Sequence, residues 1–212
     1  MSERLDLKNA ERKVFRATFD DGLWDIIIAG LAMEFAVAPL LSPALGDFWS
    51  SVIFVPFLGL LFLAIWLTRK YVVKARTGVV KFGKQRIKRL KKFTLVMVVI
   101  NVLALILGII VAFYFHALSG QMIAIIFGLI LLTGFSLAAY FLDYPRLYVY
   151  GFLLGIAPYL GEWLYSNHGA SHHGFPITFG FISGVIFLAG LITFMRFLRN
   201  SSIAADTAAK GL

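Results

Sequence analysis

Six apolar runs separated by short polar stretches form the basic pattern of this sequence. No run alternates polar and apolar residues as a barrel strand does. Each has about the ~20 residues that a helix needs to cross the ~30 Å hydrocarbon core of a bilayer. The pattern predicts an all-α integral membrane protein, a single domain built as a bundle of about six transmembrane helices. The runs lie at approximately 22–41, 48–68, 93–115, 121–142, 146–165 and 175–196.

The basic residues predict how these helices are oriented. Of the 20 Lys and Arg, 11 lie in segment 69–92, five precede the first run, and the other four are Arg146 and three residues from Arg196 onward. All of them therefore fall on the same side of the membrane, which the positive-inside rule makes the cytoplasmic side. With an even number of spans, both termini are predicted to be cytoplasmic. The expected location is the cytoplasmic (inner) membrane of a prokaryotic cell.

Composition agrees with this class. Hydrophobic residues make up 60% of the 212, and the mean hydropathy is +0.85. The chain therefore carries more apolar surface than one soluble core could bury. In a soluble protein a net charge of +9 would indicate binding to nucleic acid, but here the cations flank apolar spans. They indicate the lipid bilayer and its anionic lipids as partners, and no nucleic acid. The chain has no cysteine, which excludes disulfides, thiolate metal sites and cysteine nucleophiles.

The basic segment 69–92 has an order of its own. Valine pairs on both sides of Arg76-Thr77-Gly78 predict a small hairpin, and the residues after Gly83 predict an interfacial helix that runs into the third span. Two interpretations remain open: a loop that sets topology and touches lipid, or a site for a phosphorylated ligand or an acidic partner. The cations expected to contact anionic lipid or phosphate are Arg76, Lys81, Lys84, Arg86, Lys88 and Arg89.

Two short motifs carry a resemblance. FDDGLWD at 19–25, before the first span, and RTGVVKF at 76–82, after the second, together resemble small, uncharacterised prokaryotic polytopic membrane proteins. In those proteins the second motif more usually has proline and an aromatic residue where this chain has Ala75 and Val79. The resemblance covers roughly the first 90 residues. It implies the same topology and does not imply any activity.

Several local features predict helix starts and helix packing. Asp20, Asp21 and Asp25 are expected to open the first helix, where negative charge complements the helix dipole, with a functional acidic site as the alternative. The short turn 143–146 predicts that the fourth and fifth helices are antiparallel neighbours, with Asp143 and Arg146 paired. Small residues one turn apart predict that the fifth and sixth helices pack on each other. They are Gly151, Gly155, Gly180 and Gly184.

Glu34 is the most unusual residue of the apolar runs. It lies near the middle of the first span, where an ionised side chain costs at least ~2.5–3.5 kcal/mol on insertion scales. It should therefore face the bundle, be protonated or be paired, and Asn101 of the third span is one polar candidate partner. A proton or cation relay and a neutral carboxylic acid bonded between helices are both open. In the relay, Glu34 and Asn101 would line a polar path toward Glu162.

All four histidines fall in the connections predicted to face outward. Three imidazoles and a carboxylate from Glu162 or Asp47 would suit Zn²⁺ or Cu²⁺. The H-x-x-x-H spacing lacks the glutamate of a metalloprotease motif, so a solvated polar loop and a pH sensor are alternatives. The histidines are His116, His168, His172 and His173.

Three function classes follow. The first is transport-like handling of a small solute or ion by an intramembrane carboxylate. The second is a metal-dependent membrane enzyme or metal-binding protein, with the outer histidines as ligands and Glu162 as general base. The third is an accessory subunit that holds other chains, as a homodimer or in a larger membrane complex.

Overall fold

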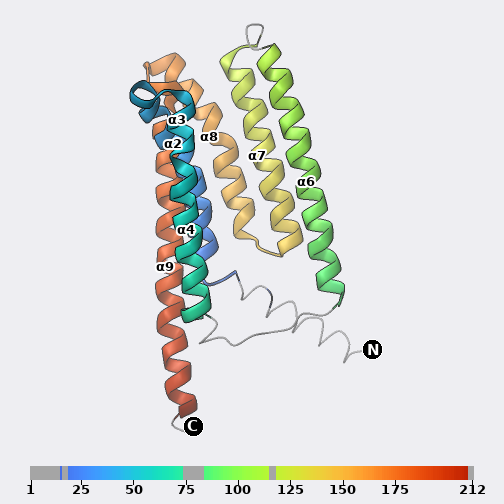
Figure 1. The fold of residues 1–212 in the computed structure, drawn as a ribbon, viewed down its shortest axis with the longest axis vertical. Helices are drawn as coiled ribbons and strands as arrows, with labels where there is room; N and C mark the ends of the chain where they lie inside the picture. The colour runs from blue at the N-terminus through green and yellow to red at the C-terminus, as the bar shows by residue number, and fades with distance from the viewer. Residues whose placement is uncertain (1–14, 16–18, 74–83, 115–117, 210–212) are drawn as a thin grey trace. The chain divides into compact units, whose positions relative to one another are not determined.

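The computed structural model describes residue 15 and residues 19–73, 84–114 and 118–209, with the side chains of 84–86 and 201–209 outside that description. The described residues form helices and no strand, which confirms the all-α prediction for this part of the chain. In chain order (Figure 1) the elements are α2 (Leu23–Leu45), α3 (Asp47–Val52), α4 (Phe54–Thr68), the π-helical turn η1 (Arg69–Val73), α6 (Lys84–Phe113), α7 (Gly120–Leu142), α8 (Arg146–His168), the 3-10 turn η3 (His172–Gly174) and α9 (Phe175–Ala209).

Five helices are long and apolar enough to cross a membrane, as in a multi-pass membrane protein. They correspond to five of the six predicted spans. Their ranges are Leu23–Leu45, Asp47–Val73, Ile87–Phe113, Gly120–Leu142 and His172–Asn200.

The remaining predicted span, α8, differs in composition rather than in length. Its 23 residues extend about 34 Å at 1.5 Å per residue. It is less apolar than the others, and it buries a long face that includes Tyr150, Pro158 and Glu162. Because protein rather than lipid covers that face, α8 tolerates polar residues that a lipid-facing helix would not.

Several helix boundaries differ from the predicted spans. α2 continues to Leu45 and ends at Gly46, whose φ of 80° a non-glycine residue rarely adopts. α6 begins at Lys84 and runs without a break to Phe113, so the expected helix after Gly83 does continue into the third span. Of the predicted hairpin, Val72 and Val73 belong to η1 rather than to a strand. The rest of that hairpin, at 74–83, lies outside the described residues.

The chain forms two compact units. The first unit comprises Met1–Glu34, Leu41–Phe82 and Ser183–Leu212, and the second comprises Phe35–Leu40 and Gly83–Ile182. In the first unit, Leu23, Ile27 and Ile65 form a buried cluster between α2 and α4. α2 and α9 approach closely because Gly22 and Gly190 have no side chains, and a Cβ on Gly22 would collide with the carbonyl oxygen of Gly190.

In the second unit, α7 lies between α6 and α8 (Figure 1). A Cβ on Gly128 would collide with the Gly155 carbonyl oxygen, and one on Gly151 would lie 2.6 Å from the Cβ of Phe135. Residue numbers fall along α8 as they rise along α7, so the two helices are antiparallel neighbours, as predicted. α8 does contact the last span, as predicted, but through Gly161, where a Cβ would lie 3.0 Å from Phe175 and 3.2 Å from Thr178. The predicted glycines are wrong, because Gly151 and Gly155 face α7.

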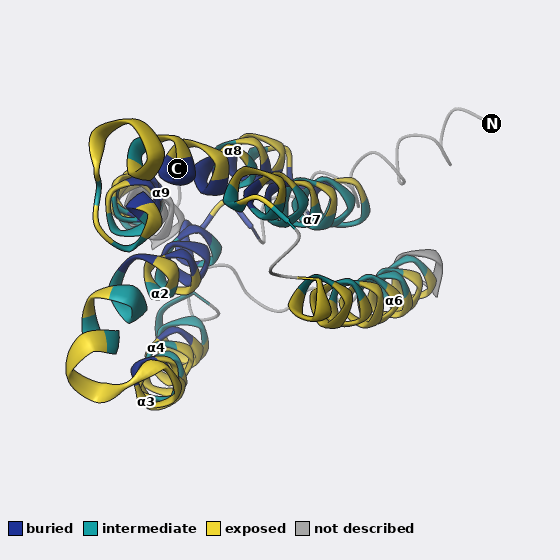
Figure 2. Ribbon diagram, turned by 90° about the horizontal axis from the view of Figure 1, so that it is seen from above, coloured by how far each residue is buried: buried dark blue, intermediate teal, exposed yellow. Residues whose placement is uncertain are grey.

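Burial is unevenly distributed over the second unit. Figure 2 shows dark-blue, buried segments along α8, whereas the described part of α6 is coloured as intermediate and exposed. From Ile87 to Tyr114 no residue is buried. Phe35, Phe127 and Phe179 pack their rings together with centroids 5.1–6.4 Å apart. The buried face of α8 and the fully buried Phe179 therefore lie in the interior of the unit, and α6 is peripheral to it.

Candidate functional site

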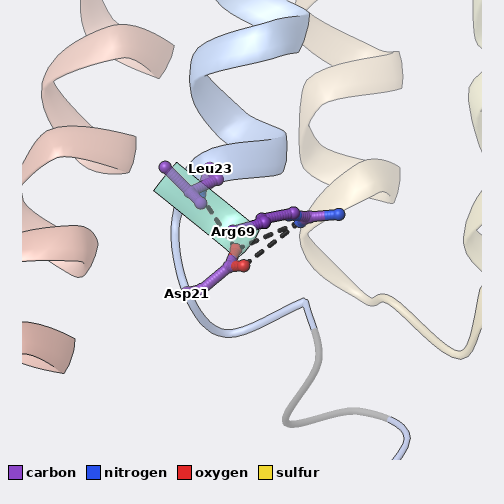
Figure 3. A network of polar contacts seen from close by, with 3 residues as sticks. All are labelled: Asp21, Leu23 and Arg69. Atoms are coloured by element: carbon purple, nitrogen blue, oxygen red, sulfur yellow. Dashed lines mark hydrogen bonds and ion pairs between the residues drawn. The ribbon is translucent and has the colours of Figure 1, made fainter. Parts of the chain in front are cut away.

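Asp21 and Arg69 join the start of α2 to the end of α4. The Nη2 atom of Arg69 lies 3.2 Å from Oδ2 and 3.4 Å from Oδ1 of Asp21, and Oδ1 also accepts the backbone N–H of Leu23 at 3.0 Å (Figure 3). The Asp21 side chain is only 3% exposed. Asp21 therefore has the predicted helix-start role, and in addition it forms an ion pair with Arg69 that was not predicted.

The surroundings of this ion pair are aromatic and tightly packed. The guanidinium of Arg69 lies 4.8 Å from the ring centroid of Trp24, a distance typical of a cation–π contact. Asp25 is fully buried, and a Cβ on Gly190 would lie 2.9 Å from the Cβ of Asp25. The motif residues at 19–25 thus serve mainly to attach α2 to α4 and α9. The second motif, at 76–82, lies outside the described residues.

Burial changes the acidity of Asp21. Removal from water raises its pKa above the ordinary value of 3.8, because the charged form loses hydration. The Arg69 cation and the N–H of Leu23 act in the opposite direction without cancelling the effect, while the nearby Asp25 adds to it. The carboxyl is thus more basic than an exposed aspartate despite its ion pair.

Glu34 is the twelfth of the 23 residues of α2, about 16 Å from either end of the helix. It is half-buried, and it takes part in no hydrogen bond or ion pair within the described part of the chain. Asn101 is exposed, and its Nδ2 donates to the carbonyl of Met97 in its own helix at 2.8 Å. This bond gives no support to a role for Asn101 in lining a polar path.

A cavity of about 290 Å³ lies in the first unit between α2, α4 and α9. Its one hydroxyl belongs to Ser183, whose Oγ lies 3.2 Å from the Sδ of Met33. Such an apolar lining suits hydrocarbon and not an ion. The lining residues are Ile26, Ala29, Gly30, Met33, Phe57, Leu61, Ser183, Gly184 and Phe187.

Glu162 and His173 form a second polar pair, near the end of α8. Oε2 of Glu162 lies 2.8 Å from Nδ1 of His173, and their side chains are 10% and 58% exposed. A Cβ on Gly120 would collide with Glu162, so the carboxylate lies at the N-terminus of α7, where the helix dipole favours negative charge. The His173 ring also packs on the ring of Tyr165, with centroids 4.4 Å apart.

The backbone beside this pair is strained. His172 and His173 both have φ of 53°, and Gly174 has φ of 62°. A non-glycine residue in the left-handed region costs roughly 1–2 kcal/mol, and such residues gather at functional sites. Close packing holds this turn in place, because Gly174 is buried against the backbone of Gly161.

The described histidines do not come together as a metal centre. The ring centroid of His168 lies 4.8 Å from that of Trp163, and Nδ1 of His172 is buried without a hydrogen bond to any described residue. Among the described residues no three His, Asp or Glu side chains are grouped so as to hold a metal ion. Asp47 bonds Ser42, and His116 lies outside the described residues.

The basic residues of α6 have different environments. Nη1 of Arg89 lies 2.9 Å from Oδ2 of Asp143, its Nη2 bonds the Tyr140 carbonyl, and its guanidinium lies over the Tyr140 ring. Arg89 therefore fastens α6 to the end of α7 and is not a freely available phosphate ligand. Lys88 is exposed, as a lipid contact would be. Of the others, Arg76 and Lys81 lie outside the described residues, as do the side chains of Lys84 and Arg86.

Comparison with protein-family models, with curated proteins and with solved structures finds no match for this chain.

The sequence analysis predicted neither the pair of Asp21 and Arg69 nor the pair of Glu162 and His173, and the reason is the same. Asp21 and Arg69 are 48 residues apart, and no spacing rule connects positions on different helices. Glu162 and His173 were each singled out, but as metal ligands rather than as partners. One available signal was that each is an ionisable residue at the edge of an apolar run, where a buried charge requires a partner.

Proposed function

We propose that this protein is a transport-like membrane protein that handles a small cation or solute, with Glu34 as the group that binds it. The observation that supports this proposal is the place of Glu34: halfway along an apolar helix, half-buried, and with no ion pair in the described part of the chain. A carboxylate at that depth is costly and is usually retained for a function. A proton is the simplest cation for a single carboxylate to exchange.

Proteoliposomes that contain a pH-sensitive dye test this proposal. An imposed gradient should drive flux through the wild-type protein, and Glu34→Gln should reduce it at least about tenfold, because an amide cannot exchange a proton. Glu34→Asp should keep part of the flux. Asp47→Asn is the matched control, since Asp47 is exposed and lies in the short helix α3. Flux through the Glu34→Gln variant equal to that of the wild type would contradict the proposal.

The proposed topology has six spans, including α8, with both termini and segment 69–92 in the cytoplasm of a prokaryotic cell. It is supported by the one-sided distribution of Lys and Arg and by the length of α8. The cysteine-free chain permits a direct test with single cysteines. In intact cells, an impermeant thiol reagent should label Asn167→Cys but label Lys91→Cys only after permeabilisation. The reverse pattern would invert the topology.

Binding of a metal ion by the outer histidines is a second candidate. The contact between Glu162 and His173 supports it, because a carboxylate commonly orients a metal-binding imidazole through its other nitrogen. Purified protein should then hold about one equivalent of Zn or Cu, and His173→Ala should lose it. Metal-free protein that binds neither added ion would eliminate this candidate.

A further inference from the structure

Within the second unit, most of the surface of α6 is not covered by the other described helices. The side toward α7 is recognisable as a row of partly buried residues spaced three and four apart, which includes Phe93, Ile100 and Leu107. The remaining positions from Ile87 to Tyr114 are exposed or partly buried, and none is buried. In a membrane, hydrocarbon or another helix must cover them.

Asn101 distinguishes these two coverings. It lies at the middle of the apolar segment Ile87–Phe113 and is exposed. Its Nδ2 is bonded to the Met97 carbonyl, whereas its Oδ1 accepts no hydrogen bond from the described part of the chain. Hydrocarbon offers no donor, and an unpaired amide there costs several kcal/mol on alkane scales. A partner that supplies a donor at this depth would remove that cost.

We propose that α6 is a dimerisation helix, and that Asn101 pairs with Asn101 of a second copy of this chain. An amide carries both a donor and an acceptor, so it is complementary to itself. Two copies inserted in the same orientation place this residue at the same depth, and a two-fold axis along the membrane normal brings the two amides together. This proposal does not depend on the function proposed for Glu34.

The positions beside Asn101 fit a helix–helix contact. Val98 and Leu105 lie one turn to either side and are 54% and 65% exposed. Farther along the same face, a Cβ on Gly108 would meet nothing within 4 Å, and Ala112 is exposed one turn later. Small residues there let two backbones approach closely, and interhelical hydrogen bonds add to the packing.

The absence of cysteine makes the face directly testable, because a single introduced cysteine can crosslink only between two chains. Leu105→Cys lies about 40° around the helix from Asn101, whereas Leu103→Cys lies about 160° away. Both leucines are exposed, at 65% and 59%. Oxidation in native membranes should yield at least about tenfold more dimer from Leu105→Cys. Equal yields, or no dimer from either variant, would overturn the proposal. Absence of dimer from both variants is the result expected if another part of the same chain covers α6.

The role of the amide is tested in the Leu105→Cys background. Asn101→Leu should reduce dimerisation in detergent about three- to thirtyfold, the range expected for a hydrogen bond between membrane helices. Asn101→Gln keeps the amide and should retain most of the dimer. Because Asn101 is exposed, Asn101→Leu should fold normally, which the unchanged melting temperature of the monomer fraction would verify. A dimer fraction unaffected by Asn101→Leu would overturn the assigned role of the amide.

Discussion

The carboxylate of Asp21 lies 3.2 Å from the guanidinium of Arg69, although 48 residues separate them in the chain. Asp21 is almost fully buried, whereas the Arg69 side chain is 28% exposed. Removing the cation leaves a buried acid without its partner, which is the costly way to break an ion pair. Arg69→Gln should therefore lower the free energy of unfolding by about 1–3 kcal/mol, less than a fully buried pair because solvent reaches Arg69.

A double-mutant cycle separates the pair from the individual losses. Asp21→Asn keeps an oxygen that can accept the Leu23 N–H, so the variant removes mainly the charge. In thermal unfolding of the detergent-solubilised protein, Asp21→Asn with Arg69→Gln should cost less than the sum of the single variants. Additive losses would show that the two charges contribute independently.

The raised pKa of Asp21 predicts a specific pH dependence. The folded protein binds this proton more tightly than the unfolded chain, so stability falls as the pH rises from 3.8 through the higher folded pKa. Below 3.8 the stabilising contribution of this proton is fully present and does not change with pH, because both states are protonated. Asp21→Asn should flatten this part of the curve of melting temperature against pH, whereas the exposed Asp20→Asn should not. A wild-type curve that rises over the same range would contradict the assignment.

The contact between α7 and α8 depends on a glycine that the packing requires. Gly128→Ala places a Cβ against the carbonyl oxygen of Gly155, a backbone atom that can move only if the helices separate. The expected loss is about 1–3 kcal/mol in unfolding free energy. Gly134→Ala in the same helix is the control, because a Cβ there meets nothing within 4 Å. It should be neutral or stabilising by up to about 1 kcal/mol.

Two adjacent cations of α6 should behave differently. Arg89→Gln removes the ion pair with Asp143 and the bond to the Tyr140 carbonyl, and should destabilise the protein by about 1–2 kcal/mol. Lys88→Gln should leave the melting temperature unchanged and weaken binding to vesicles that contain anionic lipid. Equal loss of stability in both variants would show that Arg89 has no special structural role.

The amino-acid sequence by itself determined the class of protein and the approximate position of its helices, because these depend on local quantities. Hydropathy over about 20 residues reports whether a helix can exist in hydrocarbon. The short turn at 143–146 was sufficient to predict that α7 and α8 are antiparallel neighbours, since a short connection leaves few alternatives. The continuous helix from Lys84 into the third span was also a local inference.

Only the tertiary structure decided which side chains meet. The pairing of Asp21 with Arg69, and that of Glu162 with His173, depends on the rotation of each helix about its axis. The pattern of apolar residues hardly constrains this rotation when lipid and protein interior are equally apolar. For the same reason Gly151 and Gly155 face α7 rather than the last span. Helix rotation in a membrane is specified by a few close contacts and polar pairs, and these become apparent only when the helices are packed.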